Sequence, residues 1–218
     1  MRHRAILLFA SLFVLTAAAP ARAQWNDYKK WEISPFVGFE TSGSYPVNSA
    51  VNGSANFDRL RANSGASFGT FLGYSLTENA QAEFMWARNS TSFSGRDITT
   101  HAYSKVFSSD IDHFQFGFLY MLRNSEMKLR PFIAGSFGFT HEFNDANPNR
   151  TLLAFGLGGG VKYNLNRHFA LRGEMRWLPS RANKTPGIVC DQFFGCYQQN
   201  ISNYLEFVNF TGGFAFRF

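Results

Sequence analysis

The segment Phe210-Thr211-Gly212-Gly213-Phe214-Ala215-Phe216-Arg217-Phe218 ends the chain and decides the fold. Because the side chains of a strand alternate between two faces, one face of this segment carries four phenylalanines and the other is small or polar. A strand of about 9–11 residues with one apolar face suits one crossing of a bilayer in a closed barrel. A core strand of a soluble β-sandwich shows the same alternation. A soluble terminus, however, rarely carries a bare ring such as Phe218.

Alternating aromatic residues that close on phenylalanine resemble the C-terminal insertion signal of Gram-negative outer-membrane proteins. The residues that carry the resemblance are Phe210, Phe214, Phe216 and Phe218. The resemblance implies that the barrel-assembly machinery is a partner of this chain during its insertion into the outer membrane.

Residues 1–23 have the pattern of a secretory signal peptide. Arg2 and Arg4 precede an apolar run at residues 5–19 that is too short to span a membrane, and residues 21–23 form a small-x-small cleavage site. Without this segment 18 basic and 15 acidic residues remain, so the net charge falls from +6 to +3. A charge this small gives no reason to expect a nucleic-acid partner.

Residues 24–218 are expected to form one domain, because their number suits a single domain. Phenylalanine, with 26 residues, and glycine, with 19, are frequent, whereas charged residues make up only 17% of the chain. This composition favours strands over helices. No stretch after the signal peptide approaches eighteen consecutive apolar residues, so the sequence excludes a transmembrane helix.

Eight segments of the mature chain alternate between apolar residues and small or polar ones. They are residues 31–40, 66–74, 80–89, 111–121, 129–140, 152–163, 168–178 and 204–218. The connections between them are alternately long and polar (residues 41–65, 90–110, 141–151 and 179–203) and short, which is the pattern of extracellular loops and periplasmic turns. The sequence therefore predicts an all-β fold, an eight-stranded antiparallel up-and-down transmembrane β-barrel with both ends of the mature chain in the periplasm.

Aromatic residues recur at both ends of the predicted strands. Trp31, Tyr74, Tyr120, Tyr163 and Phe218 mark one end, and Phe39, Trp86, Phe139, Trp177 and Tyr204 mark the other. Rings with a polar tip favour the bilayer interface, whereas a β-sandwich has no reason to place aromatic residues at both rims. Because lipid cannot hydrogen-bond a free strand edge, we expect the last strand to pair with the first.

Three short motifs within these segments resemble known strand signatures. They are EISPFVG at residues 32–38, LRPFIAG at residues 129–135 and GGGVKY at residues 158–163. Such signatures are similar to those of small outer-membrane barrels, the family of the OmpA membrane domain and OmpX. The resemblance implies a place in the outer membrane, with its lipid and lipopolysaccharide as partners.

Nine charged residues are predicted to point into the barrel. They are Glu32, Glu40, Glu83, Arg130, Lys162, Arg172, Glu174, Arg176 and Arg217. An eight-stranded barrel has room inside only for side chains, and an unpaired buried charge is costly, so we expect these groups to form an ion-paired plug. The alternative is a narrow ion path, although a water-filled pore prefers one sign of charge along its wall.

Cys190 and Cys196 lie in the last long connection and are expected to form a disulfide, because the chain is exported. The segment between and after them carries Phe193, Phe194 and Tyr197, which either contact a surface partner or rest on neighbouring loops. No histidine or cysteine spacing suggests a metal site, and no cofactor is expected.

A structural, adhesion or surface-binding role through the four long loops is the function that these features favour. A narrow channel for small solutes is the second reading, and an envelope enzyme acting at the outer rim is the third. The loops offer Asp97, His101, Ser104, His141 and Asp145, but any polar loop set would contain such residues. Basic loop residues suit either lipopolysaccharide phosphates or plain solvation. They are Arg59, Arg61, Arg96, Lys105, Arg150, Arg181 and Lys184.

Overall fold

The computed structural model describes residues 30–46, 57–124, 127–144, 149–181, 187–191, 195–199 and 204–218, and it consists of strands. The strands are β1 (Trp31–Ser42), β2 (Ser44–Pro46), β3 (Phe57–Ala62), β4 (Gly65–Ser75), β5 (Ala80–Asp97), β6 (Tyr103–Met121), β7 (Leu129–Asn144), β8 (Arg150–Asn164), β9 (Phe169–Arg181), β10 (Gly187–Asp191), β11 (Gly195–Gln199) and β12 (Tyr204–Arg217). A search of the described residues for a helix that is long and apolar enough to cross a membrane found none.

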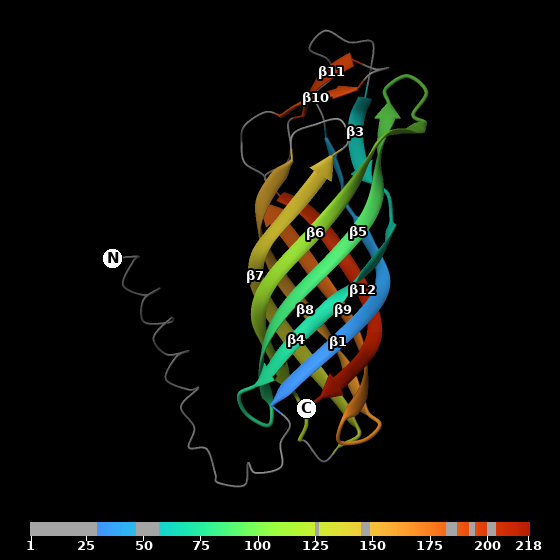
Figure 1. Cartoon of the computed structure of the whole chain (residues 1–218). Coiled ribbons are helices and arrows are strands. Elements are labelled where there is room, and N and C mark those ends of the chain that lie inside the picture. The colour runs from blue at the N-terminus through green and yellow to red at the C-terminus, as the bar shows by residue number, and fades with distance from the viewer. Residues whose placement is uncertain are drawn as a thin grey trace, which may run out of the picture.

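Eight of these strands form a closed antiparallel barrel (Figure 1). The order around the barrel is β1-β12-β9-β8-β7-β6-β5-β4, and β4 returns to β1. The predicted pairing of the last strand with the first is confirmed, with Phe39 opposite Phe210 and Ile33 opposite Phe216. Every barrel strand therefore has both edges hydrogen-bonded, as a barrel in lipid requires.

The distribution of polarity is the reverse of that in a soluble protein. Along β1, Trp31, Val37 and Phe39 are more than half exposed, whereas Glu32 and Glu40 are buried inside the barrel. The other barrel strands likewise expose large apolar side chains, such as Phe118 and Leu157, while Glu83, Lys162 and Arg172 are buried inside. A β-sandwich would bury its aromatic face, so the soluble alternative is wrong and the predicted barrel is confirmed.

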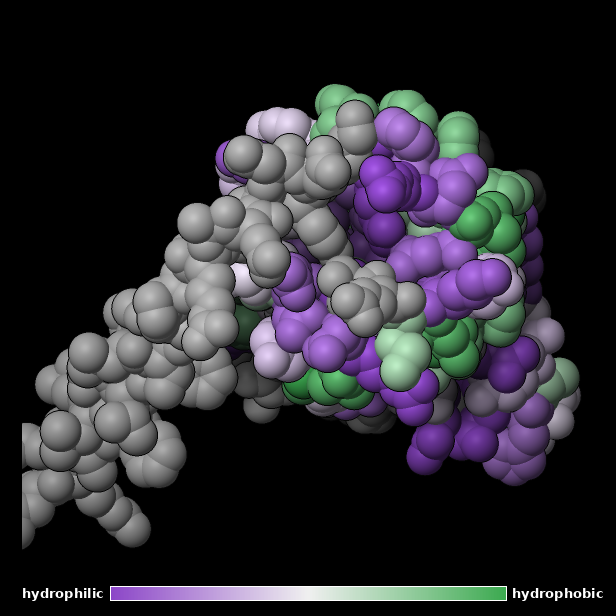
Figure 2. Space-filling model, turned by 90° about the horizontal axis from the view of Figure 1, so that it is seen from below, coloured by the Kyte–Doolittle hydropathy of each residue, from purple (hydrophilic) through white to green (hydrophobic). Residues whose placement is uncertain are grey.

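The two ends of the barrel differ. The short connections after β4, β6 and β8 lie at one end, here called the turn end, together with the C-terminus, which exchanges main-chain hydrogen bonds with Trp31 (Phe218 N to Trp31 O, 3.0 Å). Hydrophilic residues gather over this end in the view from below (Figure 2). The opposite end, here called the loop end, carries β2, β3, β10 and β11 and the far parts of β5 and β6 (Figure 1).

The prediction of a polar loop over residues 90–110 is wrong for most of that range. β5 continues to Asp97 and β6 begins at Tyr103, so a paired hairpin projects beyond the barrel, and β3 adds to it by pairing with β5. Strand also replaces part of the other predicted loops, as in β3 and the ends of β7 and β9. These segments lie where water can surround the sheet, so the outer face needs no apolar residues and the alternation that marks a strand disappears.

Candidate functional site

An ion-pair square fills the middle of the lumen. Glu83 on β5 faces Arg172 and Arg176 on β9, with Arg172 Nη1 to Glu83 Oε2 at 2.6 Å and Arg176 Nη2 to Glu83 Oε1 at 2.8 Å. Glu174, between the two arginines in sequence, accepts from Arg176 Nε at 2.6 Å and also pairs with Arg172. All four side chains are buried. Each carboxylate thus meets two guanidinium groups, which is the geometry that offsets the cost of burying charge.

Two aromatic rings pack beside Arg172 in this ion-pair square. The Cζ atom of Arg172 lies 3.7 Å from the centroid of the Phe71 ring and 5.2 Å from that of Phe132. Both rings are about 2% exposed. The guanidinium of Arg172 therefore lies between carboxylates and two buried rings, in a barrel that has room inside only for side chains.

A second charged cluster lies nearer the turn end, around Glu32. Glu32 pairs with Lys162 and accepts from Arg217 Nε at 2.8 Å, and Lys162 also donates to the side-chain oxygen of Gln81 at 2.8 Å. Arg130 lies close to the turns, where it donates to the carbonyl oxygens of Glu78 at 2.7 Å and Arg123 at 3.1 Å, and so ties two turns together.

The third cluster lies nearer the loop end and joins Glu40 to His113. The Nε2 atom of His113 is 3.0 Å from a carboxylate oxygen of Glu40, and its Nδ1 atom is 2.9 Å from Thr140 Oγ1. Two amide groups also donate to Glu40, from Asn89 at 2.8 Å and Asn209 at 3.0 Å. The sequence predicted that Glu40 points into the barrel but gave it no partner, and His113 was not among the predicted site residues. They come from β1 and β6, which are not neighbours, so no sequence signal relates their depths.

Large apolar side chains fill the space around this third cluster. Ile111 and Leu178 are fully buried, and the ring of Phe207 lies 5.4 Å from the His113 ring. Acidic and basic groups alternate along the lumen, so the described wall does not show the single sign of charge that a water-filled pore prefers. The described lumen has the composition of a packed core.

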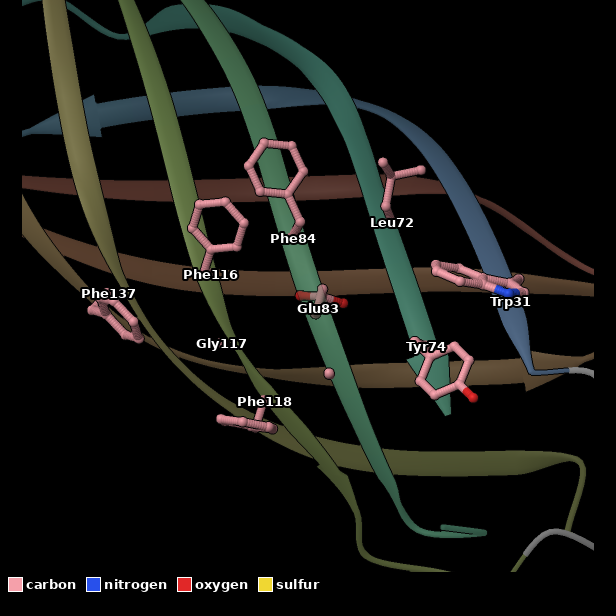
Figure 3. A pocket seen from close by; sticks show the side chains of 10 residues that line it. Trp31, Leu72, Tyr74, Glu83, Phe84, Phe116, Gly117, Phe118 and Phe137 are labelled. Carbon is pink, nitrogen blue, oxygen red and sulfur yellow. The ribbon is translucent and has the colours of Figure 1, made fainter. Parts of the chain in front are cut away.

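The outer face of the barrel carries an apolar groove of about 500 Å³ (Figure 3). Its lining includes Trp31, Leu72, Tyr74, Ala82, Phe84, Phe116, Phe118 and Phe137. The rings of Phe84 and Phe116 lie side by side, with centroids 4.7 Å apart. This composition suits hydrocarbon chains, which is what surrounds the outer face of a barrel in a bilayer.

The loop-end residues considered for catalysis do not form a catalytic arrangement among the described residues. Asp97 caps the tip of the β5–β6 hairpin, where the main-chain N–H groups of Thr100 and Thr99 donate to its carboxylate and hold its pKa below the usual range. His141, on β7, bonds Thr151 Oγ1 at 2.8 Å. Asp145 lies outside the described residues. Within the described ranges, no group of three or more histidine, cysteine, aspartate and glutamate side chains could hold a metal ion.

The cysteines lie on the short hairpin formed by β10 and β11. The backbone register places Cys190 opposite Cys196. Opposed residues of an antiparallel pair have Cα atoms about 4.5–5.5 Å apart, which is within the range that a disulfide spans. The disulfide stays a prediction: thiol labelling of the denatured protein without reductant should give no mass shift, and labelling of both thiols would contradict it. Phe193 and Phe194 lie outside the described residues.

The closed wall, its apolar exterior and its charged interior define an integral membrane β-barrel. The profile of the family described as outer membrane protein beta-barrel domain matches residues 7–218. The chain belongs to this family, so its location is the outer membrane. A search of curated protein sequences found no match.

Solved structures share the fold at low sequence identity. OprG of Pseudomonas aeruginosa is 11% identical, with a TM-score of 0.60, and the alignment covers 88% of this chain and 97% of that one. Neisserial surface protein A is 10% identical, with a TM-score of 0.57 and coverage of 86% and 97%. The outer membrane protein AlkL, solved in lipid bilayers, is 12% identical, with a TM-score of 0.51 and coverage of 92% and 95%. Each likeness concerns the fold alone.

Proposed function

We propose that this protein has a structural and surface-binding role in the outer membrane. Its loop end faces the outside of the cell and its turn end, with both termini of the mature chain, faces the periplasm. Short turns at one end and long, structured segments at the other support this orientation. Adhesion to a cell or matrix surface is one form that such binding takes.

The observation that carries the proposal is the paired extension of β3, β5 and β6 beyond the barrel. Seventeen positions of β5 are paired with β6, from Ala80 opposite Tyr120 to Arg96 opposite Tyr103. A hairpin that is hydrogen-bonded along its length holds its side chains at defined positions, and a defined surface binds a partner at a lower entropic cost than a mobile loop does.

A test of this role shortens the hairpin and leaves the barrel intact. Thr91 and Ser109 lie opposite each other, so an Asn-Gly turn between them replaces the extension with a two-residue connection. We expect the wild-type protein, purified into nanodiscs, to bind at least one of lipopolysaccharide, matrix proteins or whole cells, and the shortened variant to lose that binding. Thr77→Ala at the turn end serves as the control. Equal binding by the shortened variant would overturn the proposal.

The channel alternative predicts a different measurement. Because the described charges in the lumen pair with one another and rings close around Arg172, we expect pure protein in planar bilayers to show no steady conductance. Reproducible single-channel steps would favour the channel. We also propose that the protein is not an enzyme: His141 bonds the hydroxyl of Thr151 at 2.8 Å, but among the described residues no carboxylate bonds His141 to complete a triad.

A further inference from the structure

One face of the extension is strongly basic. The register sets Arg59 on β3 opposite Arg96 on β5, and Arg96 opposite Tyr103 on β6. Ser94 lies opposite both Arg61 and Lys105. Because opposed residues of an antiparallel sheet point to the same side, as do residues two apart in a strand, all of these side chains share one face. The basic face is defined as Arg59, Arg61, Arg96, Lys105 and Tyr103.

One contact joins the strands of the basic face, and the burial of the opposite face shows which way the basic face points. The Cζ atom of Arg61 lies 4.3 Å from the centroid of the Tyr103 ring, a cation–π contact across the sheet. The opposite face of the extension carries Ala62, Phe93 and Val106, which are buried toward the barrel axis. The basic face is therefore turned away from the axis, on the side that continues the lipid-facing wall of β5.

Three basic side chains of this face have no carboxylate partner among the described residues. Among the described residues, no salt bridge joins Arg59, Arg61 or Lys105 to a carboxylate, and all three are exposed. Nearer the barrel, Asp112 is already bound by Arg88 through two hydrogen bonds of 2.7 Å, and Asp110 lies opposite Ser90, four positions closer to the barrel than Ser94. Exposed cations that have no carboxylate partner can bind an anion from outside the sheet.

The distance of the basic face from the membrane indicates which anions it can reach. Trp86 belongs to the aromatic belt at the loop end, and Ser94 and Arg96 follow it by eight and ten residues. At about 3.3 Å per residue and a tilt of about 40°, the face lies roughly 20–25 Å beyond that belt. Phosphates next to the acyl chains sit near the belt itself, whereas phosphates on the sugars of a glycolipid headgroup lie further out. Neighbouring headgroups in the membrane plane are also what an outward face meets.

We propose that the basic face binds the phosphate groups carried on the saccharide headgroup of the outer-leaflet glycolipid, lipopolysaccharide. Guanidinium groups bind phosphate through paired hydrogen bonds, and the Tyr103 ring holds Arg61 in place for such a contact. This inference rests on the proposed surface-binding role and names the ligand class of one surface within it.

The test uses soluble, fluorescently labelled core oligosaccharide released from lipopolysaccharide, with and without its phosphates. Wild type is compared with Arg59→Ser/Arg61→Ser and with a matched control, Lys128→Ser/Arg167→Ser, which removes the same charge from exposed positions at the turn end, before β7 and after β8. All proteins are held in nanodiscs, and folding is verified by gel mobility without heating. We expect the first variant to bind the phosphorylated oligosaccharide at least tenfold more weakly, because two charge-assisted contacts are lost. The control should stay within threefold of wild type.

Salt should weaken the binding of wild type more than that of the variant, since exposed charges are screened. Equal affinity of wild type and the Arg59→Ser/Arg61→Ser variant, or equal binding of the dephosphorylated sugar, would overturn the inference. Preference for heparin over the phosphorylated core would also overturn it, in favour of a sulfated polysaccharide from another cell. If wild type binds cells through the hairpin but not the oligosaccharide, only this inference fails and the surface-binding role stands.

Discussion

Gly213→Val is expected to prevent most of the protein from closing into a barrel. A Cβ atom on Gly213 would lie 2.2 Å from the carbonyl oxygen of Pro35 and 2.9 Å from the Cα atom of Phe36, both in the main chain of β1. Main-chain atoms cannot rotate away as a side chain can, so β1 and β12 would have to separate. An open edge in lipid leaves N–H and C=O groups unpaired, at several kcal/mol for each group.

Gly212→Val is the matched control, because no atom lies within 4 Å of a Cβ atom on its neighbour Gly212. Both variants add the same side chain to the same strand at the same seam. The fraction of folded protein, measured as the fast-migrating species in unheated gel samples, should fall severalfold for Gly213→Val and stay near wild type for Gly212→Val. Equal folding of the two variants would show that the seam tolerates a side chain there.

Glu174→Ala is expected to lower the free energy of unfolding by about 3–5 kcal/mol, because it leaves two buried guanidinium groups to share one carboxylate. Arg172 and Arg176 would both depend on Glu83, which already accepts from each of them. The charge left without a partner lies in the packed lumen between Phe71 and Phe132, away from water. The loss is therefore larger than that expected for an exposed ion pair.

The comparison for this prediction is Met175→Ala, one residue further along β9 on the lipid-facing side, where the side chain is 52% exposed. Its removal should cost about 1 kcal/mol. Urea unfolding in phospholipid vesicles, followed by tryptophan fluorescence, measures both variants. If Glu174→Ala costs no more than Met175→Ala, the ion-pair square contributes nothing to stability and the lumen tolerates a free charge.

The sequence predicts the strands correctly where a single physical constraint acts on every second residue. In the membrane-crossing parts, lipid on the outer face demands apolar side chains, so the alternation at residues such as Ile33, Val37 and Phe39 locates the strand and its direction. Beyond the bilayer this demand ends. Ser90 to Arg96 continue the pairing with β6, with one register shift after Phe93, yet their outward side chains are polar, and the pattern indicated a loop.

For the charged interior too, the sequence predicts some features and not others. That Glu83, Arg172, Glu174 and Arg176 point inward follows from their positions in alternating strands, and three of them lie close in the sequence. The pairing of Glu40 with His113, or of Glu32 with Lys162, joins strands that are separated around the barrel. Such pairs depend on the stagger of the closed sheet, which sets the depth of every strand relative to the others.

The sequence by itself determined the barrel, its strand count and the sides of the wall, because those follow from local alternation and from the need to leave no free edge in lipid. Only the tertiary structure decided which buried charges meet, how far the sheet projects beyond the membrane and which basic residues share a face. Each of these depends on register between segments that are distant in the chain, and a single sequence carries no local signal of register.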